Sequence, residues 1–301
     1  MTRVWLDVPG EYQWNVPFTD ERASGYAQLV RELLGAAERT VWLYSPLALG
    51  LARALDRSLL VYDVMDDLAA FAKAPPELRE LHRELLAEAD VVFAGGRSLL
   101  AGVAAARPDA HLFPSGVEPE DYAAARRARP GSGRPVAGYV GVIDERLDLD
   151  LLAGLAEELP DWELRLVGPV VEKIDPASVP RAPNIVRTGM QPYERLPAHM
   201  RDFDVALMPF ALNEATRSIS PTKTLEYFAA GLPVVSTRVP DVVADYGEYV
   251  ELADDAAGFA EACRTLRAGD YEAHAERVRP LLERQRWSAI AARMAEIVDA
   301  R

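Results

Sequence analysis

The sequence predicts an α/β protein built from two units, each with a parallel sheet. Short apolar runs alternate with helical patterns between residues 40 and 94, and the same alternation starts again at Val136. Between the two series, residues 123–134 contain a Pro- and Gly-rich break that is typical of a linker. A length of 301 residues also fits about two domains. We therefore expect an incomplete first unit at 1–128, a second unit at 129–285 and a closing helix at 286–301 that packs back on the first unit.

The individual elements follow from apolar periodicity and from residues that begin or end helices. In the first unit we expect strands at 3–8, 40–44, 58–62 and 90–94, and helices at 19–38, 47–55 and 76–89. In the second unit we expect strands at 136–140, 163–167, 185–188, 204–210 and 234–235, and helices at 148–159 and 287–300. A further helix should begin near Pro221 and Thr222, since proline suits a first turn and threonine can cap it. Gly231 then ends this helix.

Composition excludes several classes of protein. The formal net charge of −14 argues against a nucleic-acid binder, which needs a basic surface to neutralise phosphates. The one cysteine, Cys263, lies in a helical pattern and is expected to be a packing residue. No apolar run reaches the ~18 residues of a membrane span, and no signal peptide is visible. We expect a cytoplasmic protein, and the sequence leaves open peripheral contact with the inner face of the cell membrane as well as the oligomeric state.

A lysine and a glutamate stand three residues apart on the helix that begins near Thr222. Lys223 and Glu226, together with Tyr227, are expected on the side opposite the apolar face of Leu225 and Phe228. The start of a helix at the carboxyl edge of a sheet favours phosphate binding. One interpretation is therefore a diphosphate at the helix start, steadied by Lys223, with Glu226 accepting hydrogen bonds from sugar hydroxyls. The alternative is an exposed ion pair of about 0.2–0.5 kcal/mol with no further role.

Three predicted strands of the second unit each run into a glycine, namely Gly141, Gly168 and Gly189. Glycine at the carboxyl end of a strand permits a tight turn and a close approach of backbone to ligand. With the Lys223–Glu226 helix, these glycines outline one edge of a ligand site. Contacts to a nucleotide base are expected near Gly189 and Tyr193.

Three carboxylates, Asp63, Asp66 and Asp67, crowd the end of a predicted strand in the first unit. Like charges this close raise one another's pKa values and favour a functional role. One of them could act as the general base for an acceptor hydroxyl. The alternative is capping of a following helix by Asp66 or Asp67. Asp66 is the preferred catalytic residue, with Asp63 as its orienting partner or as the alternative base.

The pattern Pro221-x-Lys223-x-x-Glu226-Tyr-x-Ala-x-Gly231-x-Pro233-Val-Val resembles the nucleotide-binding signature of GT-B glycosyltransferases, the group that includes families 1 and 4. The resemblance implies two Rossmann-like domains that face a central cleft. It also implies that Glu226 binds the nucleotide ribose and that the turn of Ser220, Pro221, Thr222 and Lys223 lies near the diphosphate. Many family 4 members carry another glutamate eight positions earlier, where this chain has Ser218.

In the resembled family, a loop after the first strand of the second domain supplies cations to the diphosphate. Val142 occupies the usual arginine position there, so Arg146 is the residue that matches this role. The alternative is a solvated arginine, or an ion pair between Arg146 and Asp144 or Asp148. The first unit is shorter than the family's first domain and lacks its glycine-rich loop. Either the sequence starts late, the domain is a reduced variant, or the protein has lost catalysis.

The resemblance implies a metal-independent hexosyltransferase that moves a sugar from a nucleotide-diphosphate sugar to a hydroxyl of a cell-envelope, polysaccharide or natural-product acceptor. Alternatives are a GT-B-shaped nucleotide-sugar epimerase and a catalytically inactive GT-B partner protein. Asp148-Leu-Asp150 matches a metal-binding pattern, but its position at a helix start favours capping. The four histidines show no metal-ligand spacing, so no metal or other cofactor is expected. The sequence leaves open the base, the sugar, the acceptor and the stereochemical course.

Overall fold

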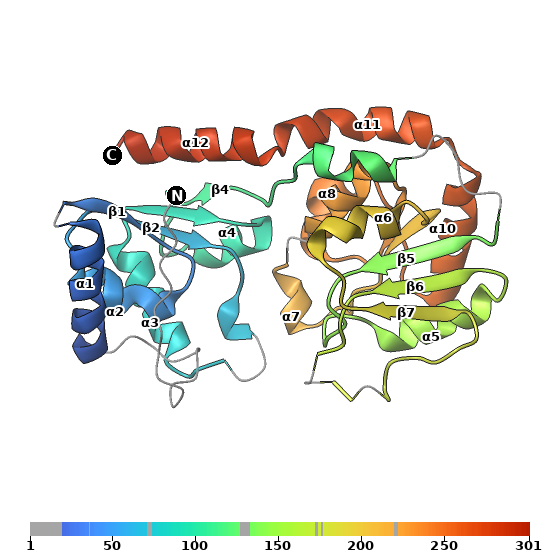
Figure 1. Cartoon of the computed structure of the whole chain (residues 1–301), viewed down its shortest axis with the longest axis horizontal. Coiled ribbons are helices and arrows are strands. Elements are labelled where there is room, and N and C mark those ends of the chain that lie inside the picture. The colour runs from blue at the N-terminus through green and yellow to red at the C-terminus, as the bar shows by residue number, and fades with distance from the viewer. Residues whose placement is uncertain are drawn as a thin grey trace. The chain divides into compact units, whose positions relative to one another are not determined.

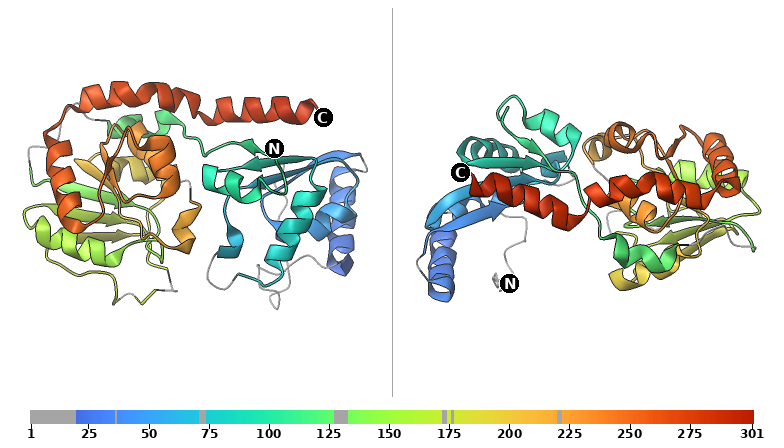
Figure 2. Two further views of the ribbon diagram at one scale, coloured as in Figure 1. Left: turned by 180° about the vertical axis from the view of Figure 1, so that it is seen from behind. Right: turned by 90° about the horizontal axis from the view of Figure 1, so that it is seen from above.

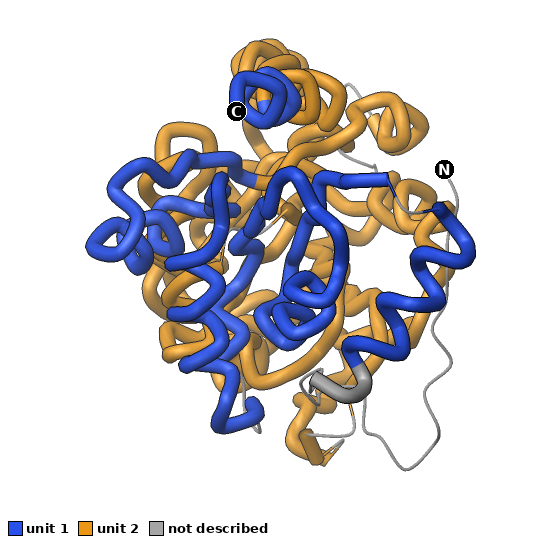
Figure 3. The backbone as a smooth tube through the Cα atoms, turned by 90° about the vertical axis from the view of Figure 1, so that its left-hand side faces the viewer, with its two compact units in different colours: residues 1–114, 294–301 blue, residues 115–293 orange. Residues whose placement is uncertain are grey.

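The computed structural model describes residues 20–35, 37–70, 74–126, 133–171, 174–175, 177–219 and 222–301. The chain divides into two compact units, which Figure 3 colours separately. Unit 1 comprises Met1–Pro114 and Met294–Arg301, and unit 2 comprises Ser115–Arg293. The strand expected at residues 3–8 lies outside the described part of the chain. No helix within the described ranges is both long enough and apolar enough to cross a membrane.

Unit 1 contains a parallel four-stranded sheet in the order β1-β2-β3-β4 (Figure 1). Its strands are β1 (Arg39–Leu43), β2 (Arg57–Val64), β3 (Val91–Ala94) and β4 (His111–Leu112). Its helices are α1 (Asp20–Leu34), η1 (Pro46–Ala48), α2 (Leu49–Ala54), η2 (Leu68–Ala70), α3 (Leu78–Glu88) and α4 (Arg97–Val103). The core joins one face of the sheet, including Tyr62 and Val92, to Leu85 of α3 and Leu99 of α4.

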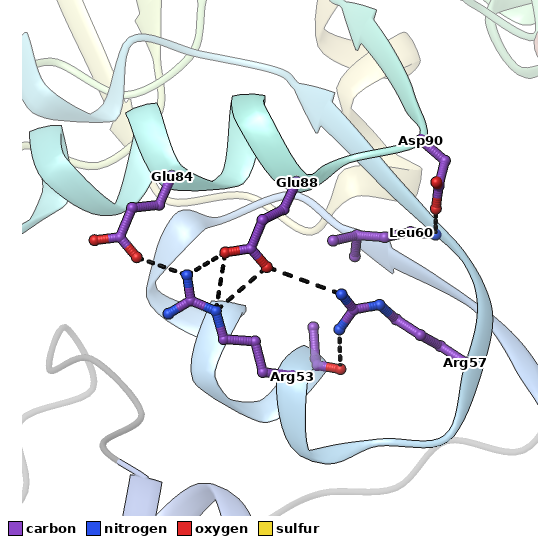
Figure 4. Close-up of polar contacts among 7 residues, drawn as sticks. Arg53, Arg57, Leu60, Glu84, Glu88 and Asp90 are labelled. Atoms are coloured by element: carbon purple, nitrogen blue, oxygen red, sulfur yellow. Dashed lines mark hydrogen bonds and ion pairs between the residues drawn. The ribbon is translucent and has the colours of Figure 1, made fainter.

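Polar contacts tie α2 and the start of β2 to α3 in unit 1 (Figure 4). Arg53 forms ion pairs with Glu84, at 2.7 Å, and with Glu88. Arg57 lies 3.8 Å from Glu88, and the Asp90 carboxylate accepts a 2.7 Å hydrogen bond from the backbone N–H of Leu60. Because the paired side chains are partly exposed, each pair contributes at most about 1 kcal/mol, and their main effect is to fix the positions of α2 and α3.

Unit 2 contains a parallel six-stranded sheet in the order β10-β9-β8-β5-β6-β7. Its strands are β5 (Val136–Val140), β6 (Glu163–Val167), β7 (Ile185–Gly189), β8 (Val205–Met208), β9 (Val234–Ser236) and β10 (Glu251–Leu252). β6 and β7 lie on one side of β5, and the later strands lie on the other. The strand order therefore reverses between β5 and β8, and such a switch point is where α/β sheets bind ligands.

Helices of unit 2 form two packed groups, in which α8 contacts α11 and η3, while α10 contacts α5 (Figure 1 and Figure 2). The helical elements are η3 (Pro119–Ala125), α5 (Leu149–Glu158), η4 (Tyr193–Arg195), α6 (Leu196–Met200), α7 (Glu214–Arg217), α8 (Thr222–Ala229), α9 (Pro240–Tyr246), α10 (Ala256–Ala268), α11 (Tyr271–Arg284) and α12 (Trp287–Asp299). Every residue of β5, β8 and β9 is buried, as expected for parallel strands that are covered on both faces. Cys263 is buried in this core as a free thiol.

The segment that precedes the linker predicted at residues 123–134 packs into unit 2. The backbone N–H of Val117 donates to the carbonyl of Gln285 at 2.9 Å, and the Arg126 Nε donates to the carbonyl of Ala229 at 2.8 Å. Tyr122 is 1% exposed within the same core. The two units thus divide after Pro114, and the last residues of α12 group with unit 1 from Met294 onward. The domain limits expected at 128 and 285 stay a prediction.

Candidate active site

Two of the three predicted glycine turns meet at the carboxyl edge of the unit 2 sheet, beside the switch point. Gly141 follows β5 with a φ of 149°, and Gly168 follows β6 with a φ of 147°. A Cβ atom on Gly168 would lie 1.9 Å from the carbonyl oxygen of Gly141, so only glycine fits there. Gly189, with a φ of 67°, ends β7 at the edge of the sheet. All three predicted glycines therefore have a positive φ, and they lie at the carboxyl ends of three neighbouring strands, β5, β6 and β7.

Lys223 lies across the end of β5. A Cβ atom on Gly141 would be 2.2 Å from Cε and 2.8 Å from Nζ of Lys223, which shows how closely the side chain follows the backbone. Its Nζ is 5.9 Å from the centre of the Tyr139 ring. Burial lowers the pKa of Lys223, the neighbouring Arg146 lowers it further, and Glu226 and Asp144 oppose this shift. Its carboxylate neighbours therefore favour the charged form of Lys223 against the effect of burial.

Gly141→Ala is expected to weaken nucleotide binding by more than tenfold. The added methyl group would displace the Lys223 side chain, and alanine at this positive φ would also destabilise the fold by about 1–3 kcal/mol. Calorimetric titration and a melting curve measure the two effects. Gly102→Ala in α4 is a matched control, because nothing lies within 4 Å of its added Cβ. Unchanged affinity in Gly141→Ala would show that the position of Lys223 does not matter for binding.

Glu226 lies one helical turn after Lys223 and is half-buried. Burial raises the pKa of Glu226, while Lys223 and a hydrogen bond from the Tyr122 hydroxyl lower it. Lys223 and Glu226 are therefore both half-buried. The alternative that the sequence left open was an exposed ion pair, and the burial of both side chains argues against it. The prediction that Tyr227 lies on the polar side of α8 was wrong. The Tyr227 side chain is fully buried, and its hydroxyl accepts a 2.9 Å hydrogen bond from the backbone N–H of Val140, which fixes α8 to β5.

Arg146 forms the ion pair with Asp144 that the sequence left open. Its Nε lies 3.0 Å from Asp144 Oδ1 and its Nη2 lies 2.6 Å from Oδ2, a two-pronged geometry. Asp144 is 8% exposed, and Arg146 is half-buried. The loop is held by a 2.9 Å hydrogen bond from the backbone N–H of Ala211 to the Arg146 carbonyl. Because Arg146 also lowers the pKa of Lys223, the two cations act on the same region.

Tyr193 and Tyr122 complete this side of the site. Their hydroxyls are 2.8 Å apart, and both interact with the charge of Glu226. Tyr193 is 56% exposed and follows the turn at Gly189. Tyr122 was not predicted from the sequence, because it lies on η3, far along the chain from α8, and no spacing links the two. Only the packing of η3 on α8 brings its hydroxyl to Glu226.

The structure describes some of the remaining predicted residues and not others. Ser220 and Pro221 lie outside the described residues. Thr222 begins α8 and is half-buried. Asp148 caps α5, where its side chain accepts a 2.8 Å hydrogen bond from the backbone N–H of Leu151, so the Asp-x-Asp pattern is a helix start. Among the residues that the structure describes, no group of three or more His, Cys, Asp or Glu side chains has a metal-binding arrangement.

The unit 1 carboxylates differ from one another in burial. Asp63, the penultimate residue of β2, is 4% exposed and accepts a 3.3 Å hydrogen bond from Trp42 Nε1. Burial raises the pKa of Asp63 from 3.8 to about 6, and the Trp42 bond lowers it in part. The predicted cause of the pKa shift, repulsion between carboxylates, was wrong, since burial is what raises the pKa of Asp63. Asp66 is half-buried, and its Oδ1 accepts a 2.9 Å hydrogen bond from the backbone N–H of Asp67.

The fold resembles that of solved glycosyltransferases. Sucrose-phosphate synthase from Thermosynechococcus elongatus has a TM-score of 0.68 and 16% identity, over 93% of this chain and 78% of that protein. HepE from Anabaena, solved in complex with UDP, has a TM-score of 0.70 and 15% identity, over 93% of this chain and 82% of that protein. The predicted GT-B fold, with two Rossmann-like units, is therefore confirmed.

Comparisons with known sequences identify which group of glycosyltransferases this chain resembles. Residues 134–268 match the family model described as "Glycosyl transferases group 1", so the predicted resemblance to this group is confirmed. A curated relative, "Putative teichuronic acid biosynthesis glycosyltransferase TuaH" of Bacillus subtilis (strain 168), is 31% identical over 198 residues. The matched segment is 62% of this chain and 50% of TuaH, so it spans about half the length of that relative.

Proposed function

We propose that this chain is a glycosyltransferase that moves a sugar from a nucleotide-diphosphate sugar to a hydroxyl of a cell-envelope or polysaccharide acceptor. The observation that carries the proposal is the half-buried pair of Lys223 and Glu226 beside Gly141, at the switch point of the unit 2 sheet. The family match over residues 134–268 and the relationship to a teichuronic acid glycosyltransferase support the same activity. The cytoplasmic location stays a prediction from the sequence.

Several groups must share donor binding. A Kd near ~0.1 mM corresponds to ~5.5 kcal/mol, whereas a helix end stabilises an anion by only ~0.3–2 kcal/mol. Lys223 and Arg146 would therefore add positive charge at the diphosphate, and Glu226 would accept hydrogen bonds from the ribose. The exposed ring of Tyr193 offers a surface on which the base can stack.

Transfer of the sugar needs cations that stabilise the leaving diphosphate and a base that accepts the proton of the acceptor hydroxyl. The acceptor oxygen forms a bond to the anomeric carbon of the sugar, and the bond from that carbon to the diphosphate oxygen breaks. Lys223 and Arg146 stabilise the negative charge that grows on the leaving nucleoside diphosphate. We assign acceptance of the hydroxyl proton to Asp63 or Asp66 of unit 1. A pKa of about 6 suits Asp63 to this task, because a base works best when its pKa is near the working pH.

The test is a calorimetric titration of the chain with UDP, GDP and the corresponding sugar nucleotides. We expect one nucleoside diphosphate to bind and Lys223→Met to weaken that binding by more than tenfold, because the diphosphate then loses one of its two neighbouring cations. Arg279→Met on α11, an exposed cation paired with Glu276, is the matched control and should bind normally. Absence of binding to every nucleotide by the unaltered chain would contradict the proposed function.

A further inference from the structure

Tyr139 of β5 contacts both the turn that follows this strand and the side chain of Lys223. Its ring is 2% exposed, and its hydroxyl donates a 2.9 Å hydrogen bond to the carbonyl of Val142, just beyond the end of the strand. The Lys223 ammonium lies over the face of this ring, 5.9 Å from its centre. One buried side chain of β5 therefore connects the backbone of the turn to a cation of α8.

These contacts meet beside Gly141. A Cβ atom on Gly141 would lie 2.2 Å from Lys223 Cε, 2.8 Å from Lys223 Nζ and 2.7 Å from the Tyr139 hydroxyl. The lysine and the tyrosine thus fill the space that a side chain at position 141 would need. A lysine stem is long and flexible, whereas the Tyr139 ring belongs to the packed core of unit 2. The ring therefore gives the lysine a fixed surface on which to lie.

An aromatic ring and a carboxylate hold a cation in different ways. The face of a ring attracts an ammonium group by about 0.5–2 kcal/mol, and it does not use the three N–H donors in hydrogen bonds to oxygen. A carboxylate does use donors, as Asp144 does with Arg146 through bonds of 3.0 Å and 2.6 Å. Tyr139 can therefore fix the position of Lys223 and leave its donors to an anionic ligand.

A second tyrosine joins the same two elements in the opposite direction. The Tyr227 hydroxyl of α8 accepts a 2.9 Å hydrogen bond from the backbone N–H of Val140, the residue after Tyr139. Each element thus places a tyrosine against the other, at neighbouring residues of β5. A shift of α8 along β5 would break both contacts, so the pair fixes where Lys223 begins and where its ammonium ends.

We propose that Tyr139 is a positioning residue of the donor site, whose ring seats the Lys223 ammonium beside Gly141 and whose hydroxyl holds the turn after β5, so that the cation meets the diphosphate at a fixed place. This inference rests on the proposed function. Tyr139 acts through Lys223 and not on the nucleotide itself. Its removal should therefore affect nucleotide binding only while Lys223 is present.

The first experiment detects the contact between ring and ammonium by NMR. The chain has three lysines, Lys73, Lys173 and Lys223, so a sample with isotope-labelled lysine gives few Hε signals, and Lys223→Met identifies the signal of residue 223. Protons over the face of an aromatic ring resonate at lower frequency. We expect this shift in the unaltered chain and in Tyr139→Phe, and its loss in Tyr139→Leu. Absence of the shift from the unaltered chain would overturn the inference, whether or not Tyr139→Leu folds.

The second experiment is a double-mutant cycle on nucleotide affinity, measured by calorimetric titration with UDP and GDP. We expect Tyr139→Leu to weaken binding of the preferred nucleotide about three- to tenfold on its own, and to cause no further loss when combined with Lys223→Met. Tyr139→Phe keeps the ring and should bind more tightly than Tyr139→Leu. Tyr271→Leu is the matched control and should leave the affinity unchanged. It removes another buried tyrosine, whose hydroxyl donates a 2.6 Å hydrogen bond to the carbonyl of Asp204, at the opposite end of the sheet.

Three affinity results would overturn the inference alone. They are unchanged affinity in Tyr139→Leu, an equal loss from Tyr139→Leu with and without Lys223, and a loss in Tyr139→Phe as large as that in Tyr139→Leu. The second of these results is what a merely structural role would give, because a general effect on the fold does not depend on Lys223. Failure of the unaltered chain to bind any nucleotide would overturn the proposed function, and with it the role of Tyr139 at the donor site.

Discussion

Asp63→Asn is expected to lower the rate of sugar transfer by about 10²–10⁴-fold, the usual contribution of a general base, while nucleotide binding stays intact. The carboxamide preserves the shape of the side chain and can still accept the hydrogen bond from Trp42 Nε1. It has no charge with which to take a proton from the acceptor. The measurement is turnover with the donor identified by titration, beside the Kd of that donor.

The same substitution is expected to stabilise the fold above pH 6. Because burial raises the pKa of Asp63 from 3.8 to about 6, the folded chain binds the proton more tightly than the unfolded chain does. The free energy of unfolding therefore falls as the pH rises from about 4 to about 6, by at most about 3 kcal/mol. Asparagine removes this dependence on pH. At pH 8, Asp63→Asn should therefore unfold at a higher denaturant concentration than the unaltered chain, whereas at pH 4 the two should unfold at the same concentration.

Two further variants make this prediction specific. Glu77→Gln changes an exposed carboxylate of the same unit and should alter neither turnover nor stability. Asp66→Asn tests the residue that the sequence favoured, and it too should leave nucleotide binding intact. If Asp66→Asn abolishes transfer and Asp63→Asn does not, Asp66 is the base and Asp63 is a structural residue. Unaltered turnover in both variants would remove the unit 1 carboxylates from the mechanism.

Glu226→Gln is expected to weaken nucleotide binding by more than tenfold, or about 1.4 kcal/mol, with little change in melting temperature. Glutamine preserves the shape of the side chain, but it loses the negative charge that strengthens hydrogen bonds from ribose hydroxyls. It also removes the charge that raises the pKa of Lys223, so the lysine should lose its proton at lower pH. Calorimetry across a range of pH measures both effects.

In the unaltered chain, nucleotide affinity should pass through a maximum with pH. Burial raises the pKa of Glu226, so affinity falls on acidification as the carboxylate is protonated. Burial lowers the pKa of Lys223, so affinity falls on the alkaline side as the ammonium loses its proton. The acid limb should be absent from Glu226→Gln and present in Glu251→Gln, an exposed glutamate on β10. Wild-type affinity in Glu226→Gln would remove Glu226 from the site.

The carboxyl edge of the unit 2 sheet was predictable because its signals are local. Strands β5 and β6 begin and end at the residues that the apolar pattern predicts, and glycines follow both. Lys223 and Glu226 share a helix, so their spacing alone places them one turn apart. Tyr227 was misassigned because helical periodicity does not show how far the apolar face extends around α8. Burial in the structure shows that this face includes Tyr227.

The sequence by itself determined the two parallel sheets, the glycine turns and the helix that carries Lys223 and Glu226, because these depend on neighbours a few residues apart. Only the tertiary structure decided which strands flank the switch point, that Arg146 pairs with Asp144, and that Tyr122 reaches Glu226. It also decided that desolvation raises the pKa of Asp63. Contacts between distant segments, and the loss of water around a charge, depend on how the whole chain packs. A short sequence pattern does not determine this packing.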